Sequence, residues 1–498
     1  MSQRFKEYID EYMNVHVQDQ ILGQGGQGVV FRTKDPDLAI KLVTNQQGDP
    51  ITDEVAVKEY SMRFKRLRLL PLPDDIKISV PVALLRNHAG YVMQLLSEMV
   101  SFSHFWLDGP SANNISPEDI PSWLSEMPED EAKKIIHYYQ TGGLRRRLTA
   151  LYKCASLLAR LHGYGLVYGD ISPNNIFISK NLEQPSVWLI DSDNLRFEQT
   201  RGGTIIYTPR YGAPELVQLK DYGRPTSDCH AFGVVAFYLL SLLHPFIGKK
   251  VDGTDDNDWA DDDLDDENIE EKAYAGLLPW IDDLEDDSNS SDGGLPRSLI
   301  LTEKLSTLFQ QTFGPGRTKP SLRPSIYHWP EALAQASDMT VQCPSCSMSY
   351  YSDFIHPQTN DHNCPYCTTQ RPQIIVLESF RWNGSQTALS EPCWRYTREF
   401  TQNSKIAIPR RIFDDFMMVS SDTTDVVLSI TKKHILIKKT EDCTFDLSVA
   451  IDNLEHNQFK HLFKQLSLKR SQTDMRFWLF SHSTSSRLVL CSIKSGDE

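Results

Sequence analysis

Short apolar stretches bounded by glycine, proline and polar residues dominate the first hundred positions and predict strands. The predicted strands are residues 20–31, which contain a glycine turn, and residues 37–43, 80–85 and 91–96. Residues 52–70 instead predict a helix, because acidic residues lie at its start, basic residues lie near its end, and prolines follow it. The chain therefore begins with several strands and one helix.

Longer segments with apolar residues at helical spacing follow. Residues 145–162 carry one apolar stripe, and residues 229–243 and 301–313 also predict helices. The longest apolar run, residues 232–243, is shorter than the roughly 20 residues that a membrane helix needs, so we expect a buried helix and no membrane contact. Residues 101–143 are rich in serine, proline and acidic residues and predict irregular structure.

From Gln373 onward, short β-favouring stretches indicate a β-rich domain. Its strands are predicted at residues 374–377, 426–430, 434–437, 476–480 and 487–493. Lys432 and Lys433 mark a hairpin turn, and residues 459–466 predict the one helix of this region.

Length and charge change this picture in two ways. A chain of 498 residues exceeds one ordinary core, so we expect two to four domains. The formal charge of −15 is local, because residues 252–292 hold 18 acidic residues and only one lysine, Lys272. Three interpretations of this acidic insertion stay open: a solvated loop, a docking segment for a basic partner, and a cation site. The last is disfavoured because no spaced calcium-loop pattern is present.

Nine cysteines and the absence of an N-terminal signal pattern bear on the compartment. Five of the cysteines are scattered, which is typical of reduced thiols. The first residues are charged and lack an apolar segment. We therefore expect a cytoplasmic protein.

The strongest chemical signal lies in residues 168–191. Asp170 is followed five positions later by Asn175, and Asp191 ends an apolar stretch. The first carboxylate can accept the proton of an attacking hydroxyl, while Asn175 and Asp191 can hold Mg²⁺ against the phosphates of ATP. A predicted helix precedes this motif and predicted strands follow it. In that context, a chance occurrence of these residues at this spacing is a poor explanation.

A glycine-rich turn precedes this site along the chain. Without a Cβ, glycine lets backbone N–H groups approach phosphate oxygens. The glycines are Gly23, Gly25, Gly26 and Gly28, followed by Val29. Alone, the pattern also fits a flexible hairpin or a dinucleotide fingerprint, but that fingerprint needs a helix directly after the glycines, and here a strand continues.

Lys41 lies thirteen residues beyond Gly28 in Ala-Ile-Lys. A lysine in a strand usually faces solvent; the alternative pairs it with nucleotide phosphates and with a glutamate of the next helix. Glu54 and Glu59 both fit, and we prefer Glu59.

Together, these motifs and Ala213-Pro214-Glu215 resemble the eukaryotic-type Ser/Thr protein kinase family over roughly residues 18–335. The resemblance implies an α+β, two-lobed protein kinase fold that binds ATP and Mg²⁺ and phosphorylates a protein substrate. It also implies that Asp228 is a buried structural residue and that Arg323 pairs with Glu215. By the same resemblance, Met93 and Leu95 are expected beside the adenine, and residues 94–96 would connect the two lobes.

The sequence departs from the family pattern at three places. Gly169 stands where the family has an arginine before the catalytic aspartate. The absence of that arginine argues against activation by phosphorylation of the following loop. Ser172 stands where Ser/Thr kinases carry lysine, and Ser192-Asp193 replaces Phe-Gly after Asp191. These departures keep a second interpretation open, a pseudokinase scaffold that binds nucleotide or nothing. A third is a small-metabolite kinase, although such enzymes lack the Ala-Pro-Glu segment.

Two Cys-x-x-Cys pairs form the second strong signal. Cys343, Cys346, Cys364 and Cys367 have the spacing of a structural Zn²⁺ site, with a redox pair as the lesser alternative. His356 or His362 could replace a cysteine, but we expect both at the surface. No basic cluster accompanies the cysteines, so nucleic-acid binding is disfavoured.

A kinase domain followed by such a cysteine module resembles a bacterial subgroup encoded beside a von Willebrand A-domain protein and a metal-dependent protein phosphatase. That resemblance implies stress or defence signalling with these two proteins as partners. The expected organisation is a kinase domain, residues 1–335, a zinc ribbon, residues 340–370, and a β-rich accessory domain, residues 371–498. Within the first, the lobes are about 18–96 and 97–335, and the acidic insertion is 250–296.

Overall fold

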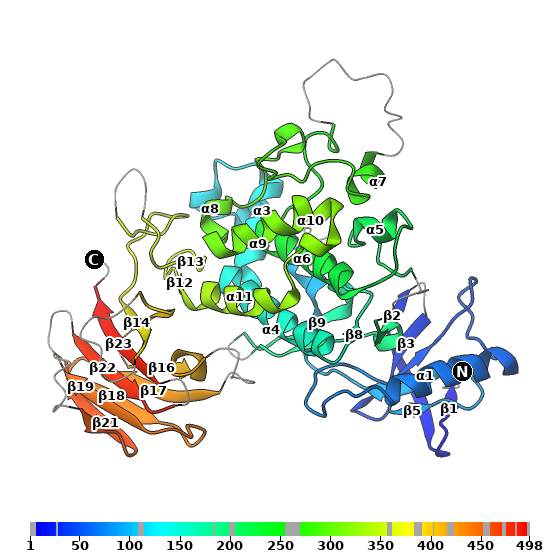
Figure 1. Cartoon of the computed structure of the whole chain (residues 1–498), viewed down its shortest axis with the longest axis horizontal. Helices are drawn as coiled ribbons and strands as arrows, with labels where there is room; N and C mark the ends of the chain where they lie inside the picture. The colour runs from blue at the N-terminus through cyan, green and yellow to red at the C-terminus, as the bar shows by residue number, and fades with distance from the viewer. Residues whose placement is uncertain are drawn as a thin grey trace.

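The computed structural model of the chain contains an N-terminal sheet with one helix, a mainly helical part, and a C-terminal pair of sheets (Figure 1). It describes residues 6–25, 28–107, 114–182, 185–198, 205–253, 269–355, 361–382, 391–401, 403–415, 423–451, 459–470, 475–483 and 486–495. Among these residues, no helix combines the length and apolar character that crossing a membrane requires.

The N-terminal sheet has six antiparallel strands in the order β1-β2-β3-β4-β6-β5. The strands are β1 (Glu7–Ile9), β2 (Val15–Gly25), β3 (Gly28–Thr33), β4 (Leu38–Leu42), β5 (Ala83–Leu84) and β6 (Gly90–Gln94). Lys41 lies on β4 between Val30 and Tyr91 of the neighbouring strands. All four strand segments predicted here are confirmed.

Helix α1 (Glu54–Arg68) packs beside this sheet and matches the predicted helix. The Asp53 carboxylate accepts a hydrogen bond from the backbone N–H of Ala56 and so caps the first turn. Val57, Phe64 and Leu67 are its buried residues. These contacts fix which face of the helix lies toward the sheet.

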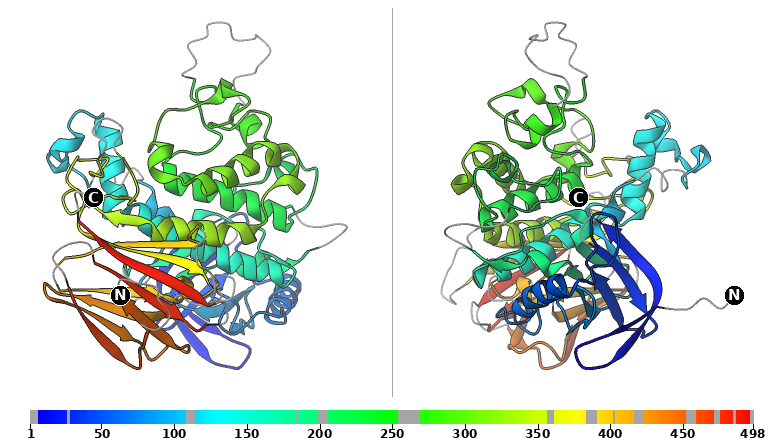
Figure 2. Two further views of the ribbon diagram at one scale, coloured as in Figure 1. Left: turned by 60° about the vertical axis from the view of Figure 1, so that its left-hand side comes forward. Right: turned by 90° about the vertical axis from the view of Figure 1, so that its right-hand side faces the viewer.

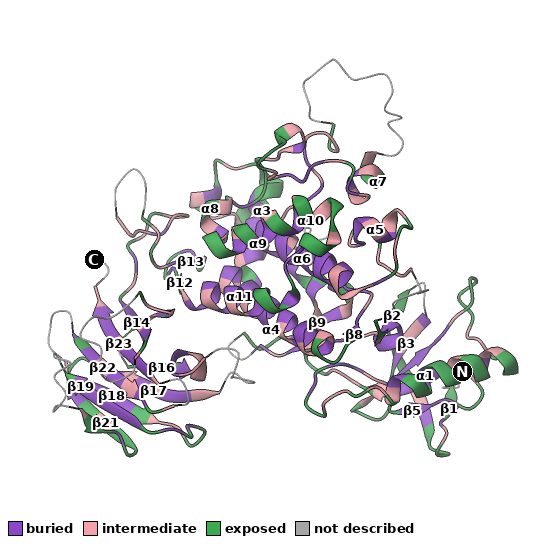
Figure 3. Cartoon of the chain, viewed as in Figure 1, coloured by how far each residue is buried: buried purple, intermediate pink, exposed green. Residues whose placement is uncertain are grey.

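The helical part is built around α4 (Gly143–Gly163) and α6 (Pro225–Ser241), whose residues are largely buried (Figure 3). The other helices are α3 (Glu129–Gln140), α5 (Pro214–Val217), α7 (Ile269–Tyr274), α8 (Arg297–Ile300), α9 (Glu303–Phe313), α10 (Pro315–Thr318) and α11 (Trp329–Asp338). Small sheets are formed by β7 (Met99–Ser101), β9 (Ile176–Ser179) and β10 (Val187–Leu189), and by β8 (Leu166–Val167) with β11 (Arg196–Phe197).

Helix α3 corrects the prediction of irregular structure over residues 101–143. Three acidic residues follow Pro128 and occupy the first turn, where they favour a helix. Ala132, Ile135 and Ile136 are buried at helical spacing. The polar composition of the surrounding segment had concealed this amphipathic stretch.

An apolar segment around Trp280, within the acidic insertion, belongs to the core of the helical part. Trp280 is only 2% exposed, and its ring lies 5.5 Å from that of Phe237 and 5.3 Å from that of Phe313. The most acidic stretch, residues 254–268, lies outside the described residues. The three interpretations of its role stay untested.

An ion pair expected from the family resemblance joins α5 to the segment before α11. The Arg323 guanidinium donates to both oxygens of Glu215 at 2.7 Å, and the two side chains are almost completely buried. Arg323 also donates to the carbonyl oxygen of Gly316. The expected pairing is confirmed.

Replacing Glu215 with Gln should lower the free energy of unfolding by about 3–5 kcal/mol, because it leaves the buried Arg323 charge uncompensated. Urea unfolding followed by tryptophan fluorescence measures this change. The double variant Glu215→Met, Arg323→Met should recover part of the loss. An unchanged single variant would show that the pair does not support the fold.

The C-terminal part contains two antiparallel sheets, ordered β15-β14-β23-β22-β19-β20 and β16-β17-β18-β21. Their strands are β14 (Ile374–Arg381), β15 (Trp394–Glu399), β16 (Ser404–Pro409), β17 (Thr424–Ile430), β18 (His434–Lys439), β19 (Leu447–Ile451), β20 (Lys460–His461), β21 (Gln465–Lys469), β22 (Arg476–Ser481) and β23 (Arg487–Lys494). The β-rich prediction and the turn at Lys432-Lys433 are confirmed.

The helix predicted at residues 459–466 is wrong. That segment contains β20 and the start of β21, and β21 pairs with β18. Pairing with β18 satisfies the backbone of this segment, which a helix would satisfy internally. Its helix-like composition is therefore overridden by the sheet partner.

Figure 2 shows the C-terminal sheets beside the helical part, and two polar junctions join them. At the first, Arg145 of α4 donates to both Glu399 oxygens at 2.6 and 2.8 Å and to the carbonyl oxygen of Thr340. At the second, Asp338 at the end of α11 is fully buried. It accepts hydrogen bonds from the side chains of Arg411, Trp394 and Arg398.

Candidate active site

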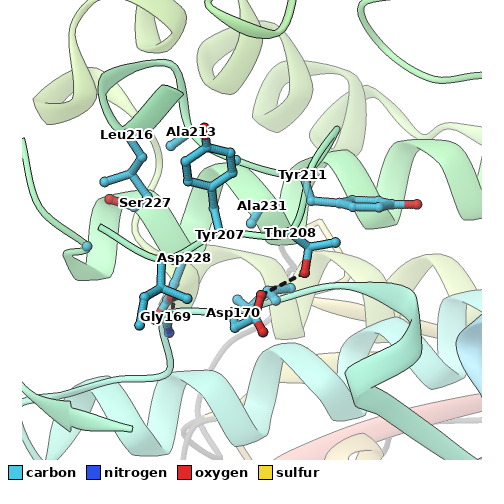
Figure 4. Close-up of a pocket in the computed structure, with 14 residues that line it drawn as sticks. Gly169, Asp170, Tyr207, Thr208, Tyr211, Ala213, Leu216, Ser227, Asp228 and Ala231 are labelled. Atoms are coloured by element: carbon cyan, nitrogen blue, oxygen red, sulfur yellow. Dashed lines mark hydrogen bonds between the residues drawn. The ribbon is translucent and has the colours of Figure 1, made fainter. Parts of the chain in front are cut away.

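Asp170 lies between β8 and a 3₁₀ turn at residues 173–175. Its carboxylate accepts a 2.7 Å hydrogen bond from the Thr208 hydroxyl, and Figure 4 shows that hydroxyl directed at it. The Asn175 amide donates to the Asp170 carbonyl oxygen at 2.9 Å and to its carboxylate at 3.1 Å. Asp170 is only 7% exposed, and burial raises its pKa against the opposing effect of the Thr208 hydrogen bond. The nearby negative charge of Asp191 raises that pKa further.

Asp228 at the start of α6 fixes the backbone before Asp170. Its two carboxylate oxygens accept the backbone N–H groups of Tyr168 at 2.8 Å and Gly169 at 2.9 Å. His162 also contacts this carboxylate, at 3.0 Å. The structural role expected for Asp228 agrees with these contacts, because they hold the loop that presents Asp170.

The guanidinium of Arg196 lies where Gly169 has no side chain. Gly169 has a left-handed φ of 83°, and a Cβ there would lie 2.7 Å from an Arg196 nitrogen. Arg196 donates to the carbonyl oxygen of Asn194 at 2.9 Å. The Arg196 guanidinium on β11 therefore places a positive charge beside Gly169, although Gly169 itself has no side chain.

Lys41 and Asp191 meet across the interface between the N-terminal sheet and the helical part. The Lys41 ammonium donates to Asp191 Oδ1, and Asp191 has left-handed backbone angles of φ 56° and ψ 54°. The backbone N–H of Ile190 donates to the carbonyl oxygen of Asn175 at 2.9 Å. The predicted residues Lys41, Asp170, Asn175 and Asp191 therefore form one cluster.

Asp193 is the second carboxylate on Lys41, at 2.8 Å from its ammonium. The other Asp193 oxygen accepts a 2.8 Å hydrogen bond from the Tyr91 hydroxyl. Arg63 of α1 donates to the Asp193 carbonyl oxygen, also at 2.8 Å. Burial alone would lower the pKa of Lys41, but the charges of Asp193 and Asp191 overcome it and raise that pKa.

The expected pairing of Lys41 with Glu59 is not the one observed. Glu59 is exposed on α1, and so is Glu54. Arg63, one helical turn beyond Glu59, is the α1 side chain that reaches the site. The family spacing pointed to the correct helix, but the carboxylate that holds Lys41 comes from the turn after Asp191.

The predicted nucleotide-binding residues that the structure describes lie on or next to strands of the N-terminal sheet, which also carries Lys41. Gly23 and Gly25 lie at the end of β2, opposite Val30 and Gly28 of β3, and a Cβ on either would meet nothing within 4 Å. Gly28 differs, since its Cβ would lie 2.1 Å from the Leu42 carbonyl oxygen. Gly26 lies outside the described residues, while half-buried Val29, Met93 and Leu95 lie on β3, on β6 and just after β6.

The side chains fit a bound Mg²⁺. Asn175 directs its NH₂ group to Asp170, so its amide oxygen remains as a ligand atom. Asp191 receives Lys41 on Oδ1, and among the described residues its Oδ2 has no recorded hydrogen bond. Two oxygens of this kind are the ligands that Mg²⁺ takes from proteins beside substrate phosphates.

Replacing the Asp193 carboxylate tests whether this group positions the Lys41 ammonium for ATP binding. Asp193→Asn should lower kcat/KM for ATP by about 10- to 100-fold, the effect of losing one charge-assisted hydrogen bond of about 1.5–3 kcal/mol. Glu59→Gln is the matched control and should stay within about twofold. The assignment fails if the Glu59 variant loses as much activity as the Asp193 variant.

The four predicted zinc ligands converge at the turn that joins β12 (Thr340–Gln342) to β13 (Ser349–Tyr351), where Cys343 and Cys346 lie. Their sulfur atoms all lie within 4.8 Å of one another, with 3.6 Å between Cys343 and Cys367 and 3.7 Å between Cys346 and Cys364. Four sulfurs about 2.3 Å from a central Zn²⁺ have this spacing. Cys343 and Cys364 each begin a similar tight turn, with Ser347 and Thr368 at positive φ.

His362 does not substitute for a cysteine, because it contacts the carbonyl oxygen of Phe354 at 2.9 Å. His356 lies outside the described residues, so its prediction stays untested. Among the described residues, the cluster with zinc-ligand spacing consists of the four cysteines.

Comparison with known proteins decides the family. A model of the protein kinase domain matches residues 124–289. The chain is also 30% identical over 251 residues to a putative serine/threonine-protein kinase PRKY of Homo sapiens, covering 79% of that protein and 50% of this chain. The chain belongs to the protein kinase family. The expectation of a Ser/Thr kinase relative is thereby confirmed at the level of the family.

The chain is also similar to two bacterial serine/threonine-protein kinases, of which it covers a smaller share than it does of PRKY. Serine/threonine-protein kinase PknD of Chlamydia caviae is 24% identical over 257 residues, which is 46% of this chain and 24% of PknD. Serine/threonine-protein kinase pkn2 of Myxococcus xanthus is 33% identical over 111 residues, or 21% of this chain and 13% of pkn2. The chain thus spans about a quarter of the length of PknD.

Proposed function

We propose that this protein transfers the γ-phosphoryl group of ATP to Ser and Thr hydroxyls of a protein substrate. The observation that carries the proposal is the single cluster formed by Lys41, Asp191, Asp170 and Asn175. These residues come from separate segments of the chain, and the fold brings them together around the carboxylate of Asp170. Phosphoryl transfer needs such a group, because positioning and charge stabilisation supply most of the catalysis.

Each residue has a role that follows from its position. Lys41 would bind the α- and β-phosphates, while Asp193 and Tyr91 hold it in place. Bound Mg²⁺ would neutralise charge on the phosphates, and Asn175 and Asp191 would hold it. The backbone from Gly23 to Gly28 would cover the phosphates, and Val29, Met93 and Leu95 would line the adenine site.

Asp170 would orient the acceptor hydroxyl and accept its proton. The hydrogen bonds from Thr208 and Asn175 fix its carboxylate, so its rotamer is set before the substrate arrives. Ser172 stands where related kinases supply a lysine for the transferred group. We propose that the nearby Lys41 and Mg²⁺ supply the necessary positive charge.

The segment from Thr208 to Glu215 supports a protein as the acceptor. Thr208 contacts Asp170, and the Glu215–Arg323 pair holds the far end of the segment. A shelf anchored at both ends is suited to an extended polypeptide beside the catalytic carboxylate. The names of the relatives also refer to Ser/Thr protein kinases.

The remaining proposals concern organisation and setting. We propose a two-lobed kinase domain over residues 1–335, a zinc ribbon over residues 340–370 in which zinc stabilises the fold, and an accessory domain over residues 371–498. The cysteine module supports the bacterial subgroup that works in the cytoplasm with a von Willebrand A-domain protein and a phosphatase in stress or defence signalling.

A label-transfer assay tests the function. The full chain is incubated with Mg²⁺, γ-³²P-ATP and a generic basic protein, and the labelled amino acids are identified after acid hydrolysis. We expect labelled phosphoserine and phosphothreonine. Tight ATP binding without any transfer would support a scaffold instead, and label confined to small molecules in a metabolite mixture would support a metabolite kinase.

A further inference from the structure

A large cleft separate from the phosphotransfer site lies between α4 and the C-terminal sheets. Its volume is about 980 Å³, within the size range of protein ligand sites. Arg145, Arg146 and Lys153 line it from α4, while Arg398, Lys405 and Arg411 line it from the C-terminal part. None of the residues assigned to phosphotransfer lines this cleft.

Positive charge dominates the cleft. Among the residues that the structure describes, seven Lys and Arg residues including Lys77 line the cleft, against the two carboxylates of Glu399 and Asp442. Glu399 is engaged by Arg145, and the buried Asp338 is shared between Arg398 and Arg411. Three carboxylates thus face seven cations, and a concave surface concentrates the resulting positive potential.

Arg146 lines the cleft without a carboxylate partner among the described residues. It is only 7% exposed, and among the described residues its recorded side-chain hydrogen bond is to the carbonyl oxygen of Ser179, at 2.9 Å. Its Nε has no hydrogen-bond partner among these residues, and neither has the buried hydroxyl of Thr423 on the other side of the cleft. Burial of a guanidinium without a carboxylate is unfavourable, and an anionic ligand would relieve it.

We propose that this cleft binds a phosphorylated segment of a polypeptide. Arginine forks match the oxygens of a phosphate group, and clusters of arginine are a common means of recognising phosphorylated peptides. Strand β16 is the edge of its described sheet, and Lys405, Ile406 and Ala407 of this strand line the cleft. An edge strand can pair with an extended peptide, which accounts for a polypeptide as the carrier of the phosphate.

The same surface is poorly suited to nucleic acid. Single-stranded nucleic acid binds by stacking its bases on accessible aromatic rings. The two tyrosines of the cleft, Tyr152 and Tyr396, are only 6% and 4% exposed.

Fluorescence polarisation with the full chain tests the site without ATP. The probes are a degenerate pool of phosphothreonine peptides, the same pool without phosphate, and a mixed-sequence single-stranded DNA oligonucleotide, all at near-physiological salt. We expect the phosphorylated pool to bind at least tenfold more tightly than either of the others. Equal affinity for the two peptide pools, or tighter binding of the DNA, would overturn the proposal.

Charge-reversal variants locate the binding. Lys153→Glu with Lys405→Glu, from opposite sides of the cleft, should weaken binding of the phosphorylated pool at least tenfold. Lys134→Glu with Lys433→Glu changes the net charge equally at exposed positions outside the cleft and should leave binding unchanged. Equal losses in both double variants would show non-specific attraction and exclude this site. Label transfer by all variants should equal that of the wild type, which separates this proposal from the phosphotransfer function.

Discussion

Replacing Asp170 with Asn should lower kcat for protein phosphorylation by about 10²- to 10⁴-fold, the usual contribution of a positioned general base. The amide keeps the size of the carboxylate and can still accept the Thr208 hydrogen bond on its oxygen. It cannot accept the proton of the attacking hydroxyl. Because Lys41 and Asp191 are unchanged, the affinity for ATP should stay within about threefold, as titration calorimetry can measure.

The pH dependence of kcat provides a second measurement of the role of Asp170. Burial raises the pKa of Asp170, and a carboxylic acid is ionised only above its pKa. The wild-type rate should therefore fall as the pH is lowered through that raised pKa. This acidic limb should disappear in the Asp170→Asn variant, and its persistence there would assign the limb to another group.

Removing the metal from the four-cysteine site should unfold the hairpin of β12 and β13 and loosen the C-terminal sheets. Structural zinc contributes about 10–16 kcal/mol of apparent binding free energy, which is also folding free energy for its module. The hairpin provides Thr340 and Ser349 as partners of Arg145, and Arg145 in turn holds Glu399. Loss of zinc should therefore spread from the cysteines to the junction with α4.

Hydrogen exchange and metal analysis together measure this effect. We expect one zinc per chain in the wild type and less than a tenth of that in Cys346→Ser, with faster exchange over residues 340–351 and 394–399. Cys393→Ser, outside the cluster, is the matched control and should retain the metal. A chain that keeps its protection after complete metal removal, or whose four cysteines form disulfides when purified, would contradict a structural zinc site.

Elements with a strong local signal could be predicted from the sequence, and those decided by packing could not. Helix α1 has its cap, its charge order and its terminating prolines within one segment. The segment of β20 and β21 has no comparable signal, because β18 decides its conformation from a distant part of the chain. Helix α3 was missed for a different reason, since a polar surrounding segment masked its buried apolar residues.

The same distinction applies to the site. Asp170, Asn175 and Asp191 are recognisable because their spacing is local and their chemistry demands those residue types. The partner of Lys41 depends on how the turn after Asp191 folds back, which no spacing rule contains. From the sequence, Asp193 was therefore only a departure from the family pattern, whereas in the structure its carboxylate contacts Lys41 and Tyr91. Arg196 beside Gly169 was missed for the same reason.

The most direct test is a crystal structure of the full chain with Mg²⁺ and a non-hydrolysable ATP analogue. We expect Mg²⁺ at about 2.0–2.1 Å from oxygens of Asn175 and Asp191, with the Lys41 ammonium bonded to both a phosphate and Asp193. The γ-phosphate should face Asp170. Nucleotide bound elsewhere, or a magnesium ion that contacts neither Asn175 nor Asp191, would contradict the central claim that these residues form one phosphotransfer site.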